Sequence, residues 1–408
     1  MKVGIVGAGP AGSLCASVLS KAGFEVFLFD YRGAWEKPCG GGVTCKALLR
    51  YPFLMDCLEK KRRISQIRVT SPRELKLTVP LQDPLLIFSR HILNGLLLAK
   101  AASEGVRFLE ERILDFQRQN SYWQLKTEKT DYRVDFLVGA DGVNSLVRKR
   151  LSSQFASQDL MMTYGYRVPV EGQDVMEIKF FSNLLGYLWV FARPGHISFG
   201  ICGRLSQNNT QTLKQHLHDF LGKNYPGAFS VLGSKFLVSR CDTERTKRAQ
   251  NSRLETQSSD RYSALIPSLR ASSFRKNKIS GQGWALVGDA AGFVDPITCE
   301  GIYYALRSGE LLANTLLESR PEAYPDACRR DFIEDFIHGA ELFEKFYLGN
   351  FLGADFITRM VQFTSRSRAL QSVMNSFISG KQGYKSLRRK LVQQSPRILF
   401  QIAGSTFS

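Results

Sequence analysis

The first twelve residues, MKVGIVGAGPAG, constrain the fold more than any other stretch of the chain. Residues 2–6 are mainly apolar and read as a buried strand, and Gly7, Gly9 and Gly12 follow it with the spacing G-x-G-x-x-G. Helical spacing then runs to Gly23, and a second apolar stretch, 24–30, ends in an acid. This order predicts a βαβ unit of a parallel sheet at the very start of the chain.

The same glycines predict a phosphate site. Gly7 permits a tight turn, Gly9 lets a pyrophosphate approach the backbone, and Gly12 lets the helix pack closely on the strand. The phosphate then meets the helix N-terminus, where unpaired N–H groups favour negative charge. Asp30 stands near the offset expected of an acid that binds ribose hydroxyls. The motif predicts dinucleotide binding and leaves NAD and FAD open.

Two later segments repeat the order of strand, Gly/Asp turn and helix. They are LVGADGVNSLVRKRL, 137–151, and ALVGDAAGFVDPITCEGIYYALRSGELLA, 285–313. Asp141 and Asp289 stand where the backbone turns, and either can accept hydrogen bonds from a ribose or ribityl chain. The alternative is that each aspartate only caps its helix.

A third glycine-rich stretch, KPCGGG at 37–42, places Cys39 directly before three glycines. Consecutive glycines cost conformational entropy and remove side chains that pack. Such a stretch is favoured where the backbone must approach something flat or charged, so it indicates a turn, a ligand or both.

Taken in order, GAGPAG, GADGVNSLVR and GDAAG resemble the FAD-dependent oxidoreductases built like aromatic hydroxylases, and KPCGGG resembles the signature of their geranylgeranyl reductase family. The resemblance spans about residues 1–320 and implies FAD as cofactor. It places the glycines of 40–42 against the flavin ring and the N-terminus of the helix after GDAAG beside it. The FAD-binding residues it implies are Gly7, Gly9, Pro10, Ala11, Gly12, Asp30, Tyr31, Cys39, Gly40, Gly41, Gly42, Arg90, Ile113, Asp141, Gly288, Asp289, Pro296, Glu300, Gly301 and Ile302.

This chain departs from the family at two of these places. Asn94 stands where the family has the aspartate that follows Arg90, and Cys299 stands where it has the glycine before Glu300. Beside the ring, Cys39 is implied as a soft wall, a proton donor or one half of a redox pair with Cys299. The alternative is a turn cysteine with no chemistry, because a thiol needs a lowered pKa to react.

Aromatic residues alternate in GYLWVFARPGHISFGI, 186–201, so that Tyr187, Trp189 and Phe191 share one face of a strand. They form either a core face or, by the resemblance, the wall of a pocket for an isoprenoid chain. The family carries Pro-Lys where this chain has Ala192 and Arg193.

The resemblance implies reduction of isolated C=C bonds of a geranylgeranyl-type chain, with hydride from reduced FAD and a proton from Cys39, Tyr187 or water. The chain shows no second dinucleotide motif, so the electron donor is expected to be NAD(P)H bound transiently, ferredoxin or a quinol-linked donor. Two alternatives remain: a flavin monooxygenase or halogenase of the same fold, since Tyr187-x-Trp189 loosely matches a halogenase W-x-W segment, and a flavoprotein that binds lipid or a partner without turnover.

Composition bounds the setting. The net charge of +18 indicates an anionic partner or simply a basic soluble enzyme; we expect no nucleic acid as a partner. The cysteines form no CxxC pair and the five histidines are scattered, so no metal site is expected, and the dispersed thiols fit a reducing cytoplasm. The sequence contains no run of about 18 apolar residues, so no transmembrane helix is expected. Residues 370–408 mix basic and apolar side chains, which suits either a helix on the inner face of a membrane or a basic helix docked on the body.

The expected fold class is α/β, within an α+β whole. A Rossmann-type FAD-binding domain comprises residues 1–62, 86–158 and 280–320. A substrate domain with a mixed or antiparallel sheet comprises 63–85 and 159–279, in which the polar stretch 242–280 is expected to form loops. A helical region, 321–408, completes the chain.

Overall fold

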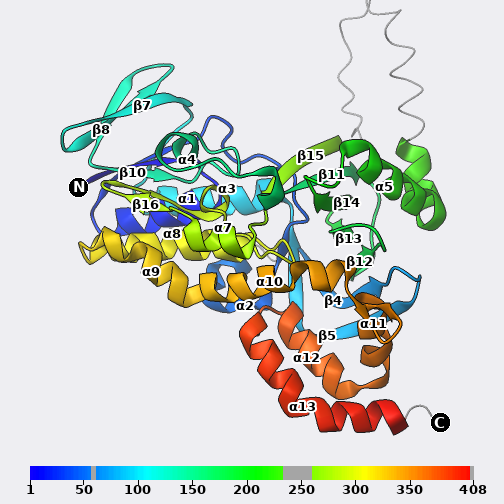
Figure 1. Cartoon of the computed structure of the whole chain (residues 1–408). Helices are drawn as coiled ribbons and strands as arrows, with labels where there is room; N and C mark the ends of the chain where they lie inside the picture. The colour runs from blue at the N-terminus through cyan, green and yellow to red at the C-terminus, as the bar shows by residue number, and fades with distance from the viewer. Residues whose placement is uncertain (57–60, 233–259, 405–408) are drawn as a thin grey trace, which may run out of the picture.

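The computed structural model describes residues 1–56, 61–232 and 260–404, and it builds them around two large sheets (Figure 1). The first sheet has the order β16-β17-β10-β1-β2-β6, and all its pairings are parallel except that of β16 with β17. Its strands are β1 (Lys2–Val6), β2 (Glu25–Phe29), β6 (Arg107–Leu109), β10 (Phe136–Gly139), β16 (Ser280–Gly281) and β17 (Trp284–Leu286). The predicted βαβ unit therefore lies near the centre of a doubly covered sheet.

Helices cover one face of this sheet and a small antiparallel sheet covers the other. Helix α1 (Pro10–Lys21) packs against α3 (Arg90–Ser103) and α8 (Ile302–Leu317). The small sheet consists of β7 (Ile113–Gln119), β8 (Tyr122–Thr127) and β9 (Asp131–Val134). Its Leu125 and Val134 press so closely on Gly4 of β1 that a Cβ there would lie 2.8 Å from Leu125 Cδ1.

The second sheet has the order β15-β11-β14-β13-β12-β4-β5-β3, antiparallel except where β12 pairs with β4. Its strands are β3 (Gly42–Val43), β4 (Lys61–Thr70), β5 (Lys76–Phe88), β11 (Leu160–Val168), β12 (Val175–Phe180), β13 (Tyr187–Arg193), β14 (His196–Arg204) and β15 (Asp260–Pro267). Helix α5 (Thr210–Asn224) packs on one face, and α10 (Glu334–Leu348) with later helices packs on the other. The domain division stays a prediction; in the second sheet, β4 and β5 run past its limits at 63 and 85, and β3 lies within the predicted FAD-binding domain.

Shorter elements connect the sheets, and helices complete the chain. The connecting elements are α2 (Cys45–Arg50), η1 (Pro52–Met55), α4 (Leu146–Leu151), η3 (Ser157–Asp159), α7 (Ala271–Lys276) and η4 (Gly288–Ala291). After α8 come η5 (Pro321–Ala323), α9 (Tyr324–Cys328), η6 (Arg329–Ile333), the hairpin β18 (Asn350–Phe351) and β19 (Ala354–Asp355), α11 (Phe356–Arg366), α12 (Arg368–Ile378) and α13 (Tyr384–Gly404). No helix within the described ranges is both long and apolar enough to cross a bilayer.

The expectation that 242–280 forms loops is wrong for its second half. Residues 260–267 form β15, which pairs along its whole length with β11, and 271–276 form α7. The polar residues on either side hid a strand whose partner lies about 100 residues earlier in the chain. Residues 242–259 lie outside the described part of the chain.

Helix α13 packs on the body along part of its length, as the docking alternative predicted, and contact of the tail with a membrane stays a prediction. Its Ile398 is buried and its Leu391 half-buried against Ala369 and Leu370 of α12. The apolar side of the helix thus faces the protein along these residues, and Val392 is the exposed exception at 67%.

Candidate functional site

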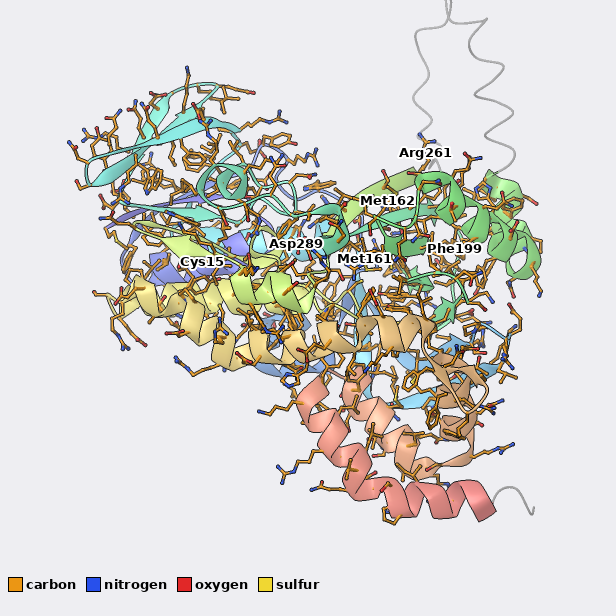
Figure 2. The ribbon with its side chains drawn as sticks, in the orientation of Figure 1. Cys15, Met161, Met162, Phe199, Arg261 and Asp289 are labelled. Carbon is orange, nitrogen blue, oxygen red and sulfur yellow. The ribbon has the colours of Figure 1, made fainter. Side chains whose placement is uncertain are left out.

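One cavity of about 800 Å³ joins the carboxyl ends of the parallel strands to the second sheet. Asp289 and Met161, labelled in Figure 2, lie in the region where the two parts of the molecule meet. Most residues predicted to bind FAD line it: Gly7, Gly9, Pro10, Ala11, Asp30, Tyr31, Cys39, Gly40, Gly41, Gly42, Arg90, Ile113, Asp141, Gly288, Asp289, Glu300, Gly301 and Ile302. Tyr187, Trp189 and Phe191 line it as well. Gly12 and Pro296 do not border the cavity.

The first turn has the geometry that its glycines predict. Gly7 has φ +104°, and a Cβ there would lie 2.4 Å from the Ala140 carbonyl oxygen. A Cβ on Gly12 would lie 2.0 Å from the Gly7 oxygen, so Gly12 serves packing rather than the ligand. A Cβ on Gly9 would meet no atom within 4 Å, and no side chain caps the N-terminus of α1. Space and unpaired N–H groups therefore coincide where a pyrophosphate binds.

Asp30 and Asp141 both fix the backbone around this turn. Asp30 Oδ2 accepts from the Ala8 N–H at 2.9 Å and so ties the end of β2 to the glycine loop. The N-cap of α4 is Ser145, whose Oγ accepts from the Arg148 N–H, so Asp141 is not the cap that the alternative predicted. Asp141 Oδ2 accepts instead from the Leu146 N–H at 2.6 Å and so supports the first turn of α4. Its Oδ1 is buried with no hydrogen-bond partner, which leaves an unused acceptor at the cavity wall.

Arg90 supplies a second unused polar atom. The side chain is 3% exposed, its Nη2 donates to Asn94 Oδ1 at 3.3 Å, and its Nε has no partner. Asn94 thus substitutes as a neutral partner for the family's aspartate. An orphaned donor and acceptor, an uncapped helix and an open glycine turn in one cavity fit an extended, phosphate-bearing group such as FAD.

Two of the three glycines of KPCGGG are required by packing within the protein. Gly41 has φ +80°, and a Cβ there would lie 2.1 Å from the Phe88 oxygen. A Cβ on Gly40 would lie 2.5 Å from the ring of Phe191. A Cβ on Gly42 would lie 3.7 Å from that ring, an ordinary contact, so packing does not require this glycine. The resemblance placed all three against a flat ring, whereas packing against β5 and β13 is by itself a reason for Gly40 and Gly41.

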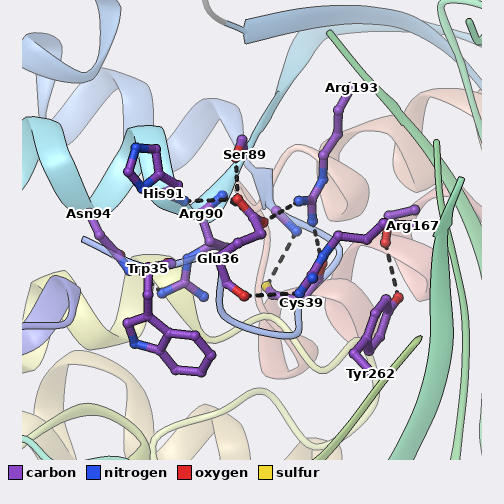
Figure 3. A network of polar contacts seen from close by, with 12 residues as sticks. Trp35, Glu36, Cys39, Ser89, Arg90, His91, Asn94, Arg167, Arg193 and Tyr262 are labelled. Carbon is purple, nitrogen blue, oxygen red and sulfur yellow. Dashed lines mark hydrogen bonds and ion pairs between the residues drawn. The ribbon is translucent and has the colours of Figure 1, made fainter. Parts of the chain in front are cut away.

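A buried ion pair that the sequence analysis missed fixes this loop (Figure 3). Glu36 accepts from the backbone N–H groups of Arg90 and His91 at the start of α3 and pairs with Arg193, which is fully buried. Arg193 also donates to the Cys39 carbonyl oxygen. Burial raises the pKa of Glu36, but Arg193 and these N–H groups outweigh it and bring the pKa to about 2. The departure from the family's Pro-Lys at 192–193 was the signal available in the sequence.

The same charges act on Cys39. Burial raises the pKa of its thiol, but the fields of Arg90 and Arg193 and the Gly41 N–H outweigh burial, so the pKa lies below its ordinary value. Cys39 is therefore more thiolate-like than a simple turn cysteine. The redox pair with Cys299 stays a prediction: both are free thiols, and Cys299 Sγ donates to Met161 Sδ at 3.4 Å.

Cys299 adopts a backbone conformation that favours glycine. Its φ is +58°, in the left-handed region that costs a residue with a Cβ about 1 kcal/mol or more. The turn before Glu300 therefore has a conformation in which glycine would be less strained than cysteine. The Gly301–Ile302 step then begins α8, with no side chain capping its N-terminus.

Lys37 closes the cavity between loops that are distant in sequence. Its Nζ lies 2.7 Å from Asp289 Oδ2, and both side chains are partly exposed. Asp289, which was predicted to contact the cofactor, lines the cavity and pairs there with Lys37.

Glu300 is the candidate proton donor of the cavity whose pKa lies near neutral pH. It lines the cavity, and its Oε1 accepts from Thr44 Oγ1 at 2.8 Å. Burial raises the pKa of its carboxyl to about 7. Tyr187 is a poorer acid, because burial raises its pKa well above the usual value and its hydroxyl donates to the Thr298 oxygen at 2.5 Å.

We expect Glu300 to make the stability of the FAD-free protein depend on pH. Its folded pKa, about 7, exceeds the ordinary value of 4.5, so its stabilising contribution is complete below pH 4.5 and is lost as pH rises through 7. Glu300→Gln should flatten that part of the profile, measured by urea unfolding from pH 4.5 to 8. Glu318→Gln, which alters an exposed glutamate paired with Arg320, should leave it unchanged; a Glu300→Gln profile matching wild type would contradict the assignment.

The remainder of the cavity is mainly apolar. The rings of Tyr187, Trp189 and Phe191 follow one another along β13 at centroid distances of 6.0 and 6.4 Å, at angles of 61° and 48° to each other. Beside them in the same sheet, β4 and β12 contribute Ile67, Val69, Ile178 and Phe180 to the lining. The C-terminal helices contribute Phe346, Tyr347, Met360 and Phe377. Tyr187, Trp189 and Phe191 therefore line the pocket, and their rings also pack against one another.

Comparisons with known proteins agree with this site. Residues 1–323 match the FAD binding domain family. An uncharacterized protein of Methanosarcina barkeri is 28% identical over 360 residues, covering 85% of this chain and 82% of its own. The geranylgeranyl diphosphate reductase of Synechocystis sp. is 24% identical over 431 residues, covering 100% and 97%.

Solved structures share the fold. A geranylgeranyl bacteriochlorophyll reductase-like protein from Thermoplasma acidophilum superposes with a TM-score of 0.75 at 21% identity, over 99% of this chain and 98% of that one. A triple mutant of a flavin-dependent brominase gives 0.67 at 18% identity, over 97% and 99%. At these identities the structures show the fold alone. Together with the family match over most of the chain, the site shows that this protein is an oxidoreductase of the FAD binding domain family, that its relatives include geranylgeranyl diphosphate reductases, and that FAD is its cofactor.

Proposed function

We propose that the protein reduces C=C double bonds in an isoprenoid chain of the geranylgeranyl type, carried by a lipid, a quinone or a diphosphate. The observation that carries the proposal is that one cavity runs from the FAD-binding loops into an apolar half lined by β13 and the C-terminal helices. Each CH₂ buried there contributes about 0.8 kcal/mol, so a long chain without polar groups is the ligand that such a wall favours.

In this proposal FAD, when bound, supplies the two-electron chemistry. Gly9, Arg90 Nε and Asp141 Oδ1 hold its polar parts, and the loop 39–42 with the N-terminus of α8 borders the reacting region. The aromatic wall of Tyr187, Trp189 and Phe191 orients the chain and excludes water, which favours a near-attack arrangement.

The proton required by the second carbon is assigned to Glu300, ahead of Cys39 and Tyr187. A donor works best when its pKa lies near the working pH, and that of Glu300 lies at about 7. Its Oε1 is engaged by Thr44, which leaves Oε2 to carry the proton. Cys39, with its lowered pKa, is better suited to a polar wall beside Arg90 and Arg193.

The electron donor is proposed to be NAD(P)H or ferredoxin, and the setting to be the cytoplasm or the inner face of a membrane. The cysteines of the described residues are all free, as expected in a reducing compartment.

The test is reduction of a defined substrate without oxygen. Purified holoprotein, reduced with dithionite, is incubated with geranylgeranyl diphosphate or a geranylgeranylated glycerolipid, and products are resolved by mass spectrometry. Gains in steps of two hydrogens support the proposal. Unchanged prenyl chains, together with substrate-dependent hydroxylation or halogenation when oxygen and halide are added, would replace it with the monooxygenase or halogenase reading.

A further inference from the structure

The β18–β19 hairpin exposes an apolar tip that the site does not use. Leu348, Phe351, Leu352 and Phe356 are 44%, 47%, 65% and 38% exposed, so four large apolar side chains meet solvent within nine residues. Apolar groups clustered in this way mark interaction sites more often than scattered ones do.

The turn itself is costly. Leu352 and Gly353 connect the two strands with φ of +49° and +74°, the left-handed pair of a two-residue hairpin. Asparagine or glycine normally occupies the first of these positions, and a leucine there costs about 1 kcal/mol or more. Leu352 therefore has both an unfavourable backbone conformation and an apolar side chain exposed to water. A residue kept at this cost points to a function for its side chain.

Two arginines hold the tip and make it cationic. Arg73, from the turn between β4 and β5, donates to the Gly353 oxygen at 3.4 Å and pairs with Asp355 at 3.6 Å. Arg359 of α11 donates to the Leu352 oxygen. Apolar side chains beside basic ones, on a chain with a net charge of +18, complement a surface that is apolar within and anionic at its edge.

The tip also adjoins the apolar half of the cavity. The exposed ring of Phe356 lies 6.1 Å from that of Phe346, which in turn lies 5.8 Å from Phe180. Phe346 and Phe180 line the cavity, as does Met360 of α11. A row of aromatic rings thus connects the exposed tip with the pocket wall. The hairpin directly precedes α11, which Figure 1 labels.

We propose that the hairpin tip, residues 348–356, inserts into the surface of an anionic lipid bilayer and brings the mouth of the cavity to the membrane. Phe351 and Leu352 enter the headgroup–acyl boundary, while Arg73 and Arg359 face the lipid phosphates. The identity of the ligand that passes from the membrane into the cavity, an isoprenoid chain, rests on the proposed function, whereas insertion of the hairpin into the membrane does not. Helix α13 is expected to contribute less to membrane binding than the hairpin tip, because its Leu391 and Ile398 pack against α12.

The test is binding of the full-length holoprotein to vesicles of phosphatidylcholine with 0 or about 30% phosphatidylglycerol, followed by sedimentation. Wild type is expected to bind the anionic vesicles more tightly, and Phe351→Ser/Leu352→Ser to lose about tenfold or more in partitioning. Leu49→Ser is the matched control, because Leu49 is 67% exposed on α2, and Val392→Ser reports on α13. Flavin absorbance and thermal unfolding confirm that each variant is folded.

A second readout gives depth. Phe351→Trp should show a blue-shifted emission and quenching by brominated acyl chains in anionic vesicles, whereas Leu49→Trp should show neither. The proposal is overturned if the double variant binds like wild type, if Leu49→Ser or Val392→Ser loses as much, or if the tip instead drives self-association that the double variant abolishes. Vesicle binding is measured without turnover, so failure to reduce prenyl chains would leave this result standing.

Discussion

Gly12→Ala is expected to unfold the nucleotide-binding half, whereas Gly9→Ala is expected to leave the fold intact and weaken FAD binding. The new Cβ at Gly12 would lie 2.0 Å from the Gly7 carbonyl oxygen, which belongs to a turn that cannot yield, so we expect a loss of about 3 kcal/mol or more. At Gly9, φ is −71° and no atom lies within 4 Å, so alanine should change stability by less than about 1 kcal/mol.

The measurement pairs urea unfolding of the FAD-free proteins with titration by FAD. Gly9→Ala should unfold like wild type yet bind FAD at least about tenfold more weakly, because its Cβ fills the space left for the pyrophosphate. Equal FAD affinity in Gly9→Ala and wild type would show that the phosphates do not pass this turn.

The second large effect is expected at Arg193. Arg193→Met removes the cation that pairs with Glu36, whose side chain is 23% exposed, and removes the donor to the Cys39 carbonyl. The loss of stability should be about 3 kcal/mol, at the lower end of the range for a fully buried pair. The substitution should also raise the pKa of the Cys39 thiol, since Arg193 is one of the groups that lower it. Urea unfolding gives the first quantity, and the pH profile of Cys39 alkylation in the FAD-free protein gives the second.

Two variants sharpen this prediction. Glu36→Gln/Arg193→Met should recover part of the lost stability, because no unpaired charge stays buried. Arg150→Met removes an arginine whose pair with Asp115 is half exposed and should cost less than about 1 kcal/mol. If Arg193→Met costs no more than Arg150→Met, the loop is held by other contacts.

The sequence predicted most strands of the first sheet, and most of the residues that it named for FAD line the cavity, because glycine spacing and apolar runs report local backbone demands. Gly7 and Asp30 lie as expected in one turn. Strand β15 was missed because its evidence is its pairing with β11, which no local pattern contains. The Glu36–Arg193 pair was missed for the same reason, since it joins residues 157 apart.

At other positions the sequence identified the right residue but not the full reason for it. The glycines at 40 and 41 were explained by the cofactor, yet Phe191 and Phe88 already exclude a side chain there. Glu300 was expected only to bind FAD, and its raised pKa depends on burial that appears once α8 and the loop before it are folded. Residue identity fixed where the site lies, and tertiary packing fixed the charge states within it.

The Lys37–Asp289 contact joins residues 252 apart, and β17 enters the first sheet only at residue 284. During synthesis at about 5–20 residues per second, roughly fifteen seconds to a minute separate the first glycine turn from the strand and helix that complete its pocket. Until β10 has been synthesised, β1 lacks one of its partner strands, and until β17 has been synthesised, so does β10. The unpaired edges of these strands can meanwhile pair with other chains. We therefore expect flavin to be retained only after β17, the turn that carries Asp289 and the start of α8 have been synthesised, because all three complete the cavity wall.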